Sequence, residues 1–145
     1  MSAEGDLKVR ALLVDDHAEA RAALAERLGR HHGLELIAVA SSLREAQEVL
    51  PESDPDIVLI DIHGHSGGGV EGCRLLRSLT DAPVVVFTSY MTYDLWTAAR
   101  EAGAADYLLK DIDTERLSRR IIRLAEAHWE ERTAQKLSND RKDWG

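Results

Sequence analysis

The chain has 145 residues, of which 44% are hydrophobic and 30% are charged, a balance typical of a soluble globular domain. This length predicts one domain with its own core. The formal net charge of -8 argues against nucleic-acid binding as the main function, and no apolar run is long enough to cross a membrane. A single cysteine, Cys73, excludes an internal disulfide and fits a reducing compartment, so we expect a cytoplasmic protein.

Apolar runs and helical patterns alternate along the chain. Buried strands are predicted at residues 9–14, 34–40, 57–60, 84–87 and 105–109. Helices are predicted at residues 18–29, from 43 to just before Pro51, 70–79, 93–102, and from Asp113 or Thr114 to Leu137, where Ser138, Asn139 and Asp140 are expected to end the last one. Ser42, with Glu45 three residues later, predicts a capping box at the start of the second helix.

Five strands alternating with five helices predict a parallel α/β sheet with right-handed crossovers. The doubly wound order 2-1-3-4-5, the flavodoxin-like arrangement, is the expected one. In such a sheet the functional crevice lies beyond the carboxyl ends of the strands, at the switch point between strands 1 and 3.

Polar residues end several of these apolar runs. Asp15 and Asp16 follow strand 1, Asp61 follows strand 3, Thr88 follows strand 4 and Lys110 follows strand 5. Three carboxylates gathered at one edge repel one another unless a cation joins them, and an oxygen-only cluster suits Mg²⁺. A lysine and a hydroxyl nearby can bind phosphoryl oxygens, which places Asp61 as the nucleophile of aspartyl-phosphate chemistry.

These motifs resemble those of bacterial two-component response-regulator receiver domains, the chemotaxis-regulator-like family. The resemblance covers residues 8–130, which we take as the domain, and leaves 131–145 as a helix extension and polar tail. It rests on four stretches in this order: Leu12-Leu13-Val14-Asp15-Asp16-His17, Ile57-Val58-Leu59-Ile60-Asp61, Val84-Val85-Val86-Phe87-Thr88-Ser89 and Gly103-Ala104-Ala105-Asp106-Tyr107-Leu108-Leu109-Lys110-Asp111. The first and last are most similar to receivers that precede helix-turn-helix DNA-binding domains.

The resemblance implies a role for each matched residue. Asp61 would accept a phosphoryl group from a phosphohistidine on a sensor histidine kinase or phosphotransfer protein. Mg²⁺ would be bound by Asp16, by Asp15 largely through water, by Asp61 and by the backbone carbonyl of His63. Such a receiver is a switch rather than a true enzyme, although it catalyses its own phosphorylation and dephosphorylation.

The resemblance also implies the output. Thr88 would be the switch hydroxyl, Tyr107 the aromatic residue that turns inward, and Lys110 the cation paired with Asp61 or its phosphoryl group. The usual output face consists of the fourth helix, the fifth strand and the fifth helix, and it would bind a downstream protein or a second copy. We expect no direct binding of this chain to nucleic acid or membrane.

One stretch departs from the family pattern. Gly64-His65 stands where Met-Pro is common, and Gly67-Gly68-Gly69 replaces the later apolar-acidic pair. Added glycine raises the conformational freedom of the backbone. We therefore expect a looser metal site or a changed rate of dephosphorylation rather than membership of a different family. His63 and His65, with His17 as a third ligand, could instead form a transition-metal site, but exposed loop histidines are the simpler interpretation.

Other interpretations remain beside this one. The chain could be a degenerate receiver that binds a partner without phosphorylation, or a receiver cut from a DNA-binding regulator, although its tail favours a stand-alone protein. An aspartate-nucleophile phosphatase would need a second acid two residues after its nucleophile, where this chain has His17 after Asp15. The arginine run of the fifth helix is either a solvated face or a charged partner surface: Arg116, Arg119, Arg120 and Arg123.

Overall fold

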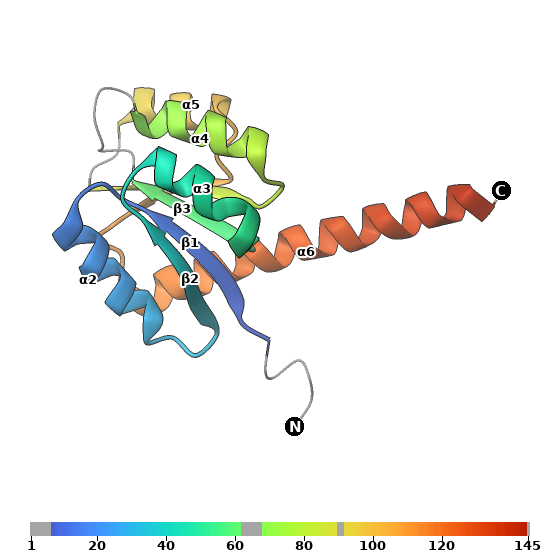
Figure 1. The fold of residues 1–145 in the computed structure, drawn as a ribbon, viewed down its shortest axis with the longest axis horizontal. Helices are drawn as coiled ribbons and strands as arrows, with labels where there is room; N and C mark the ends of the chain where they lie inside the picture. The colour runs from blue at the N-terminus through green and yellow to red at the C-terminus, as the bar shows by residue number, and fades with distance from the viewer. Residues whose placement is uncertain (1–6, 62–67, 90–91, 145) are drawn as a thin grey trace.

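The computed structural model describes residues 7–61, 68–89 and 92–144 (Figure 1). Its strands are β1 (Val9–Val14), β2 (Leu34–Ala40), β3 (Ile57–Asp61), β4 (Val84–Thr88) and β5 (Asp106–Leu109). Its helices are α2 (Ala18–Gly29), α3 (Leu43–Ser53), α4 (Gly68–Leu79), α5 (Tyr93–Glu101) and α6 (Thr114–Trp144).

The five strands form one parallel sheet in the order β2-β1-β3-β4-β5, which confirms the predicted topology. Every residue of β3 and β4 is buried, as expected for central strands covered on both faces. The sheet therefore collects the carboxyl ends of β1, β3, β4 and β5 along one edge.

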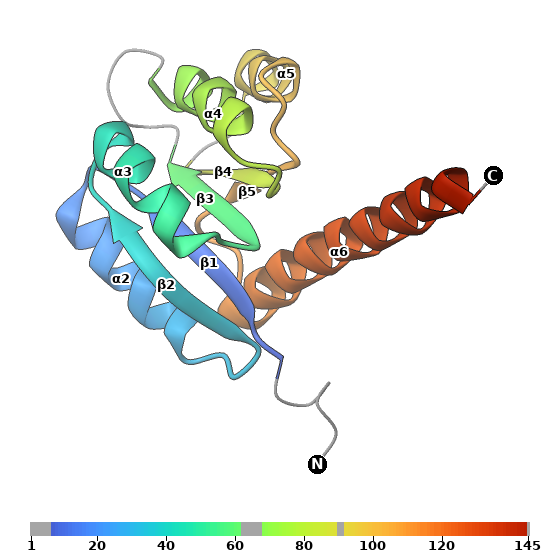
Figure 2. The ribbon, with the colours of Figure 1, turned by 45° about the vertical axis from the view of Figure 1, so that its right-hand side comes forward.

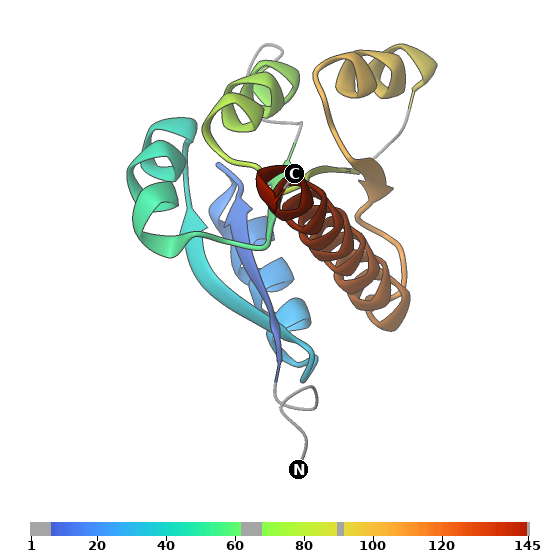
Figure 3. The same cartoon turned by 90° about the vertical axis from the view of Figure 1, so that its right-hand side faces the viewer.

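Helices cover the two faces of the sheet unequally. One buried cluster joins β-strand residues to α3, α4 and α5 through Leu50, Leu76 and Ala99, among others. The other joins the opposite face to α2 and α6 through Leu28 and Ile121. Figure 3 shows α3, α4 and α5 on one side of the sheet and α2 and α6 on the other. Each strand residue can thus be assigned to one layer by the alternation of side chains.

Helix α3 continues through Pro51 to Ser53, so the prediction that it ends before the proline was wrong. A proline removes only its own N–H from the helix, so residues after Pro51 can still donate to carbonyls four residues back, as Asp54 N does to Leu50 O at 3.0 Å. The guanidinium of Arg10 donates to Ser53 O (2.8 Å) and Asp54 O (2.9 Å). Asp54 then ends the helix in a left-handed conformation, with φ of 42°. The predicted cap is confirmed at the other end, where Ser42 Oγ accepts from Glu45 N.

Helix α6 is longer than predicted, because it runs past Ser138, Asn139 and Asp140 to Trp144. Those three residues are weak helix formers but cost only a few tenths of a kcal/mol each, and neither glycine nor proline interrupts the helix. Figure 2 shows the second half of α6 projecting beyond the sheet. Within the described residues, none of the helices combines the length and apolar character needed to span a membrane.

Asp56 fastens α6 to the edge of the sheet opposite the site. Its Oδ2 accepts from Arg10 N (2.8 Å), and its Oδ1 accepts from Trp129 Nε1 (3.1 Å). Trp129 also packs against the cluster between the sheet and α6. This carboxylate therefore connects β1, the start of β3 and the middle of α6.

Replacing Asp56 by Ala should lower the free energy of unfolding by about 2 kcal/mol, because two donors lose a partly buried acceptor at about 1 kcal/mol each. Urea unfolding followed by circular dichroism measures this change. Glu52→Ala, at an exposed position nearby, is the control and should change stability little. Equal stability of the two variants would contradict the fastening role.

Candidate functional site

The strand register explains why distant residues meet at the carboxyl edge. Val14 pairs with Ile60, so Asp15 comes next to Asp61 on the neighbouring strand. Thr88 pairs with Leu109, so Lys110 follows beside it, and Lys110 N donates to Thr88 O at 2.8 Å. Neighbouring strands lie about 4.8 Å apart, which brings these side chains within contact distance.

Lys110 joins two of the three acidic residues of the site. Its Nζ lies 2.6 Å from Asp61 Oδ2 and 3.3 Å from Asp15 Oδ2. The side chains of Asp15 and Asp61 are 0% and 6% exposed, and that of Lys110 is 21% exposed. The predicted pairing of Lys110 with Asp61 is therefore present, and the ammonium also neutralises Asp15.

The surroundings of Lys110 act on its pKa in opposite directions. Burial lowers the pKa of the ammonium, whereas its hydrogen bond with Asp61, the charge of Asp61, and the charge and hydrogen bond of Asp15 raise it. The raising effects prevail, so the pKa lies above its ordinary value and the side chain is cationic at neutral pH.

Two of the three carboxylates expected to bind metal are brought together, and Asp16 lies beside them at an exposed position. Asp15 is held by its own loop, since its Oδ1 accepts from His17 N at 2.9 Å. No three Asp, Glu, His or Cys side chains in the described ranges form a cluster able to hold one metal ion. Carboxylate oxygens are the ligands that Mg²⁺ prefers, so the residues at this edge fit the ion by type.

Thr88 and Tyr107 belong to the other layer of the sheet. Tyr107 packs in the cluster with α5, whereas Phe87, the neighbour of Thr88, packs in the cluster with α2 and α6. By alternation, Thr88 faces the α5 side, diagonally across from Tyr107, because Val86 is the residue paired with Tyr107. Thr88 is 0% and Tyr107 5% exposed, so Tyr107 is already turned inward.

Some predicted features cannot be compared with the structure. His63, His65 and the departing stretch 64–67 lie outside the described residues, and so does the expected carbonyl ligand of His63. Helix α4 begins at Gly68, within the three-glycine run, two residues earlier than expected.

Two arginines of α2 belong to the surroundings of the site and were missed in the sequence. Arg21 Nη1 donates to Asp15 O at 2.9 Å. Arg27 donates to Lys110 O (3.1 Å), Ile112 O (2.8 Å) and Thr114 Oγ1 (2.9 Å). The residues that Arg27 contacts lie 83 to 87 positions away in the chain, so no local sequence pattern predicts these contacts. Only the position of Arg27 on the face of α2 that points toward β5 could have suggested them.

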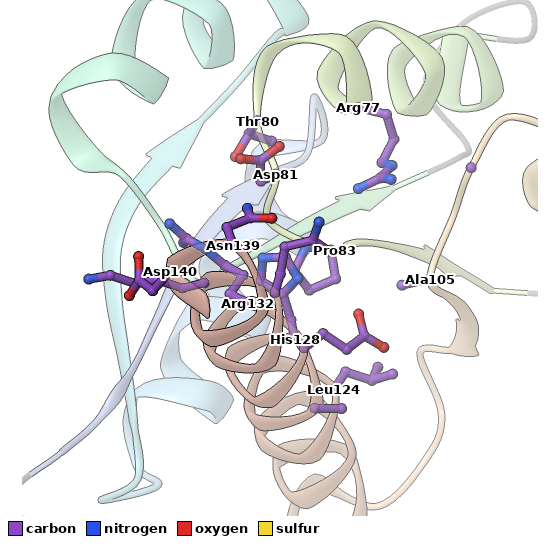
Figure 4. Close-up of a pocket in the computed structure, with 15 residues that line it drawn as sticks. Arg77, Thr80, Asp81, Pro83, Ala105, Leu124, His128, Arg132, Asn139 and Asp140 are labelled. Carbon is purple, nitrogen blue, oxygen red and sulfur yellow. The ribbon is translucent and has the colours of Figure 1, made fainter. Parts of the chain in front are cut away.

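A cavity of about 890 Å³ lies away from these residues, between α6 and the segments that precede β4 and β5 (Figure 4). Its charged lining is balanced. Three side chains are cationic and three anionic: Arg77, Arg132, Lys136, Asp81, Glu131 and Asp140. The charged residues that line this cavity therefore have no predominant sign of charge.

The face formed by α5, β5 and α6 carries both aromatic and charged side chains. Tyr93 is 77% exposed, and Arg100 lies 4.8 Å from the centre of the Trp96 ring. Arg120 pairs with Asp106 of β5 at 2.7 Å, and Arg119 with Glu115 at 3.4 Å. Part of the arginine run thus makes ion pairs within the chain, as on a solvated helix face.

Comparison with known proteins identifies related sequences and structures. The family model described as response regulator receiver domain matches residues 11–122. The activator DevR/DosR of Mycobacterium tuberculosis H37Rv is 35% identical over 114 residues, which are 78% of this chain and 52% of that protein. The transcriptional regulatory protein PdtaR of strain CDC 1551 is 35% identical over 125 residues, covering 86% of this chain and 60% of its own.

Solved structures show the same fold. A LuxR-family two-component response regulator from Aurantimonas sp. SI85-9A1 aligns with a TM-score of 0.75 and 30% identity, over 83% of this chain and 86% of that one.

The chain belongs to the response-regulator receiver family, whose members are signalling switches typically phosphorylated on aspartate. It spans about half the length of the curated relatives it matches.

Replacing Lys110 by Met should lower the free energy of unfolding at pH 7 by about 2–4 kcal/mol, because two buried carboxylates lose their shared cation. The folded-state pKa of Lys110 is raised above 10.5, so its stabilisation is complete below pH 10.5 and is lost as the pH rises through the folded value. Denaturant titrations at pH 7, 9 and 11 test both statements.

Lys136→Met, at an exposed position, is the matched control and should leave stability almost unchanged. A Lys110→Met chain as stable as the wild type at pH 7 would show that the pair contributes nothing.

Proposed function

We propose that this chain is a Mg²⁺-dependent phosphoacceptor switch in which Asp61 receives a phosphoryl group from a phosphohistidine of a sensor histidine kinase or phosphotransfer protein. The observation that carries the proposal is the Lys110 ammonium, which lies 2.6 Å from Asp61 Oδ2 and also contacts Asp15. A cation held against an acceptor carboxylate is suited to bind the charge that a phosphoryl group brings to it.

The transfer needs no proton from Asp61. One of its carboxylate oxygens forms a bond to phosphorus as the bond between phosphorus and the donor imidazole nitrogen breaks, and the imidazole leaves with the electron pair. The product is an acyl phosphate, which water later hydrolyses. Asp61 thereby exchanges one negative charge for two, and Lys110 is placed to donate to the new oxygens.

Asp15, Asp16 and Asp61, with the carbonyl of His63, are the residues that would hold Mg²⁺. The bound ion would supply charge neutralisation at the phosphoryl oxygens. Asp15 is suited to this role because its loop is fixed on both sides. Asp15 N donates to Ala40 O, and His17 N donates to the Asp15 carboxylate.

Thr88 and Tyr107 connect the site to the output face in this proposal. The Thr88 hydroxyl would donate to a phosphoryl oxygen. Its diagonal neighbour Tyr107 would then change its packing in the layer beneath α5. The face of α5, β5 and α6 would then bind a downstream protein or a second copy of the chain. Exposed Tyr93 and the partly exposed Trp96 support this assignment, since aromatic residues are common anchors of interfaces.

The same proposal divides the chain into a receiver at 8–130 and a helix extension and polar tail at 131–145. It places the chain in the cytoplasm, where phosphohistidine donors of sensor kinases act. It describes a switch that catalyses its own phosphorylation and hydrolysis rather than an enzyme with a separate substrate.

Incubation with a small phosphoryl donor and Mg²⁺ should add the mass of one phosphoryl group to the intact wild-type chain. Asp61→Asn should add none, because the amide is not a nucleophile toward phosphorus. Asp54→Asn, an exposed position at the other edge of the sheet, is the control and should react like the wild type. Phosphorylation of the Asp61→Asn chain would place the acceptor elsewhere, and a wild type that never reacts, even with kinases, would favour the degenerate receiver.

Thr88→Ala should still gain the phosphoryl group but transmit it poorly, because the hydroxyl that responds to the phosphoryl oxygen is lost. The indole N–H signal of Trp96 in NMR spectra reports on α5. It should shift on phosphorylation of the wild type and shift at most weakly in Thr88→Ala. An equal shift in both chains would remove Thr88 from the switch.

A further inference from the structure

The segment between β5 and α6, which carries Lys110, accepts hydrogen bonds from a side chain of α2. Arg27, on the last turn of α2, donates through all three of its guanidinium nitrogens. Nη1 reaches Lys110 O at 3.1 Å, Nη2 reaches Ile112 O at 2.8 Å, and Nε reaches Thr114 Oγ1 at 2.9 Å. The three acceptors cover the whole connection from the end of β5 to the first residue of α6.

Backbone hydrogen bonds hold this connection at both ends, and at the α6 end Asp113 O accepts from Leu117 N at 2.9 Å. Lys110 N donates to Thr88 O at 2.8 Å, and Ile112 N donates to Leu109 O at a longer 3.3 Å. The carbonyls of Lys110 and Ile112 are the groups that Arg27 binds. A change in the path of this backbone moves the Lys110 side chain, whose Nζ must lie within hydrogen-bond distance of two carboxylates at once.

Arg27 is itself held in place. It lies between Leu24 and Leu28, which are both buried in the cluster beneath α2 and α6, and its own side chain is half-buried. A guanidinium with few alternative conformations loses little entropy when it binds, and hydrogen bonds from a charged donor are stronger than neutral ones. Helix α2 is therefore a fixed support for the connection.

We propose that Arg27 is a positioning residue that sets the Lys110 ammonium against Asp61 and Asp15 through this three-point contact. Arg27 touches neither carboxylate and acts only through the backbone of residues 110–112 and the hydroxyl of Thr114. The consequence for phosphoryl transfer rests on the proposed function, but the positioning of Lys110 is a property of the unphosphorylated chain.

The planar guanidinium is required rather than the charge alone. Lysine at position 27 keeps the charge but presents one ammonium, which cannot reach three acceptors spread over five residues. Arg27→Lys and Arg27→Ala should therefore behave alike. Arg30→Ala is the matched control, because Arg30 lies at the same end of α2 and pairs with exposed Glu26.

The first experiment measures how fast Lys110 is acylated in the unphosphorylated chain, by mass spectrometry, relative to the exposed Lys8, Lys136 and Lys142. Arg27→Lys and Arg27→Ala should raise the relative rate of Lys110 about tenfold, since the ammonium is less firmly held behind its carboxylates. Arg30→Ala should leave it unchanged. Labelling of the fully buried Cys73 in the same samples reports global opening, and it should stay at the wild-type rate.

The second experiment compares initial rates of phosphorylation by a small donor in a double-mutant cycle. Arg27→Ala should slow the reaction about tenfold when Lys110 is present and by less than twofold in a Lys110→Ala background, because a positioning residue acts only through the group it positions. Equal losses in both backgrounds would show a general structural effect and overturn the proposal.

The outcomes separate the two proposals. The role of Arg27 is overturned if the acylation of Lys110 is unchanged in Arg27→Ala or in Arg27→Lys. A parallel rise in Cys73 labelling overturns it as well. A wild type that takes no phosphoryl group overturns the proposed function, while the acylation rates still decide whether Arg27 positions Lys110.

Discussion

The structure of the site depends on one cation between two buried carboxylates. Asp15 and Asp61 are almost fully removed from solvent, so their mutual repulsion is poorly screened. The Lys110 ammonium contacts both and relieves that repulsion, and its position requires that β1, β3 and β5 end at the same level of the sheet. The register of the parallel strands is thus also a condition of the charge balance.

The alternation of side chains separates two tasks at this edge. Asp15, Asp61 and Lys110 belong to the layer of α2 and α6, whereas Thr88 and Tyr107 belong to the layer of α5. Helix α2 accordingly reaches both parts of the charged group, through Arg21 on the Asp15 loop and Arg27 on the Lys110 connection. Helix α2 therefore supports the charged residues from one face of the sheet, whereas the proposed switch residues Thr88 and Tyr107 lie on the opposite face.

Local patterns in the sequence were sufficient for the strand order and for the residues at the carboxyl edge. Asp15, Asp61 and Lys110 each end an apolar run, and parallel topology alone brings such ends together. The features that were missed depend on contacts between distant residues. Arg10, more than forty positions away, binds Ser53 O and Asp54 O where α3 ends, and Arg27 binds residues more than eighty positions away.

The length of α6 is another feature that local sequence patterns did not predict. Residues 130–142 are all exposed, so burial does not explain why they are helical, and an isolated segment of this length would be marginal in water. The first four turns, however, pack through Leu117, Ile121 and Ala125, and Trp129 is bound to Asp56. Those turns already meet the cost of nucleation, and each following residue needs only a favourable propagation step. Ser138, Asn139 and Asp140 weaken that step without reversing it, so the helix continues through them to Trp144, the last residue that the structure describes.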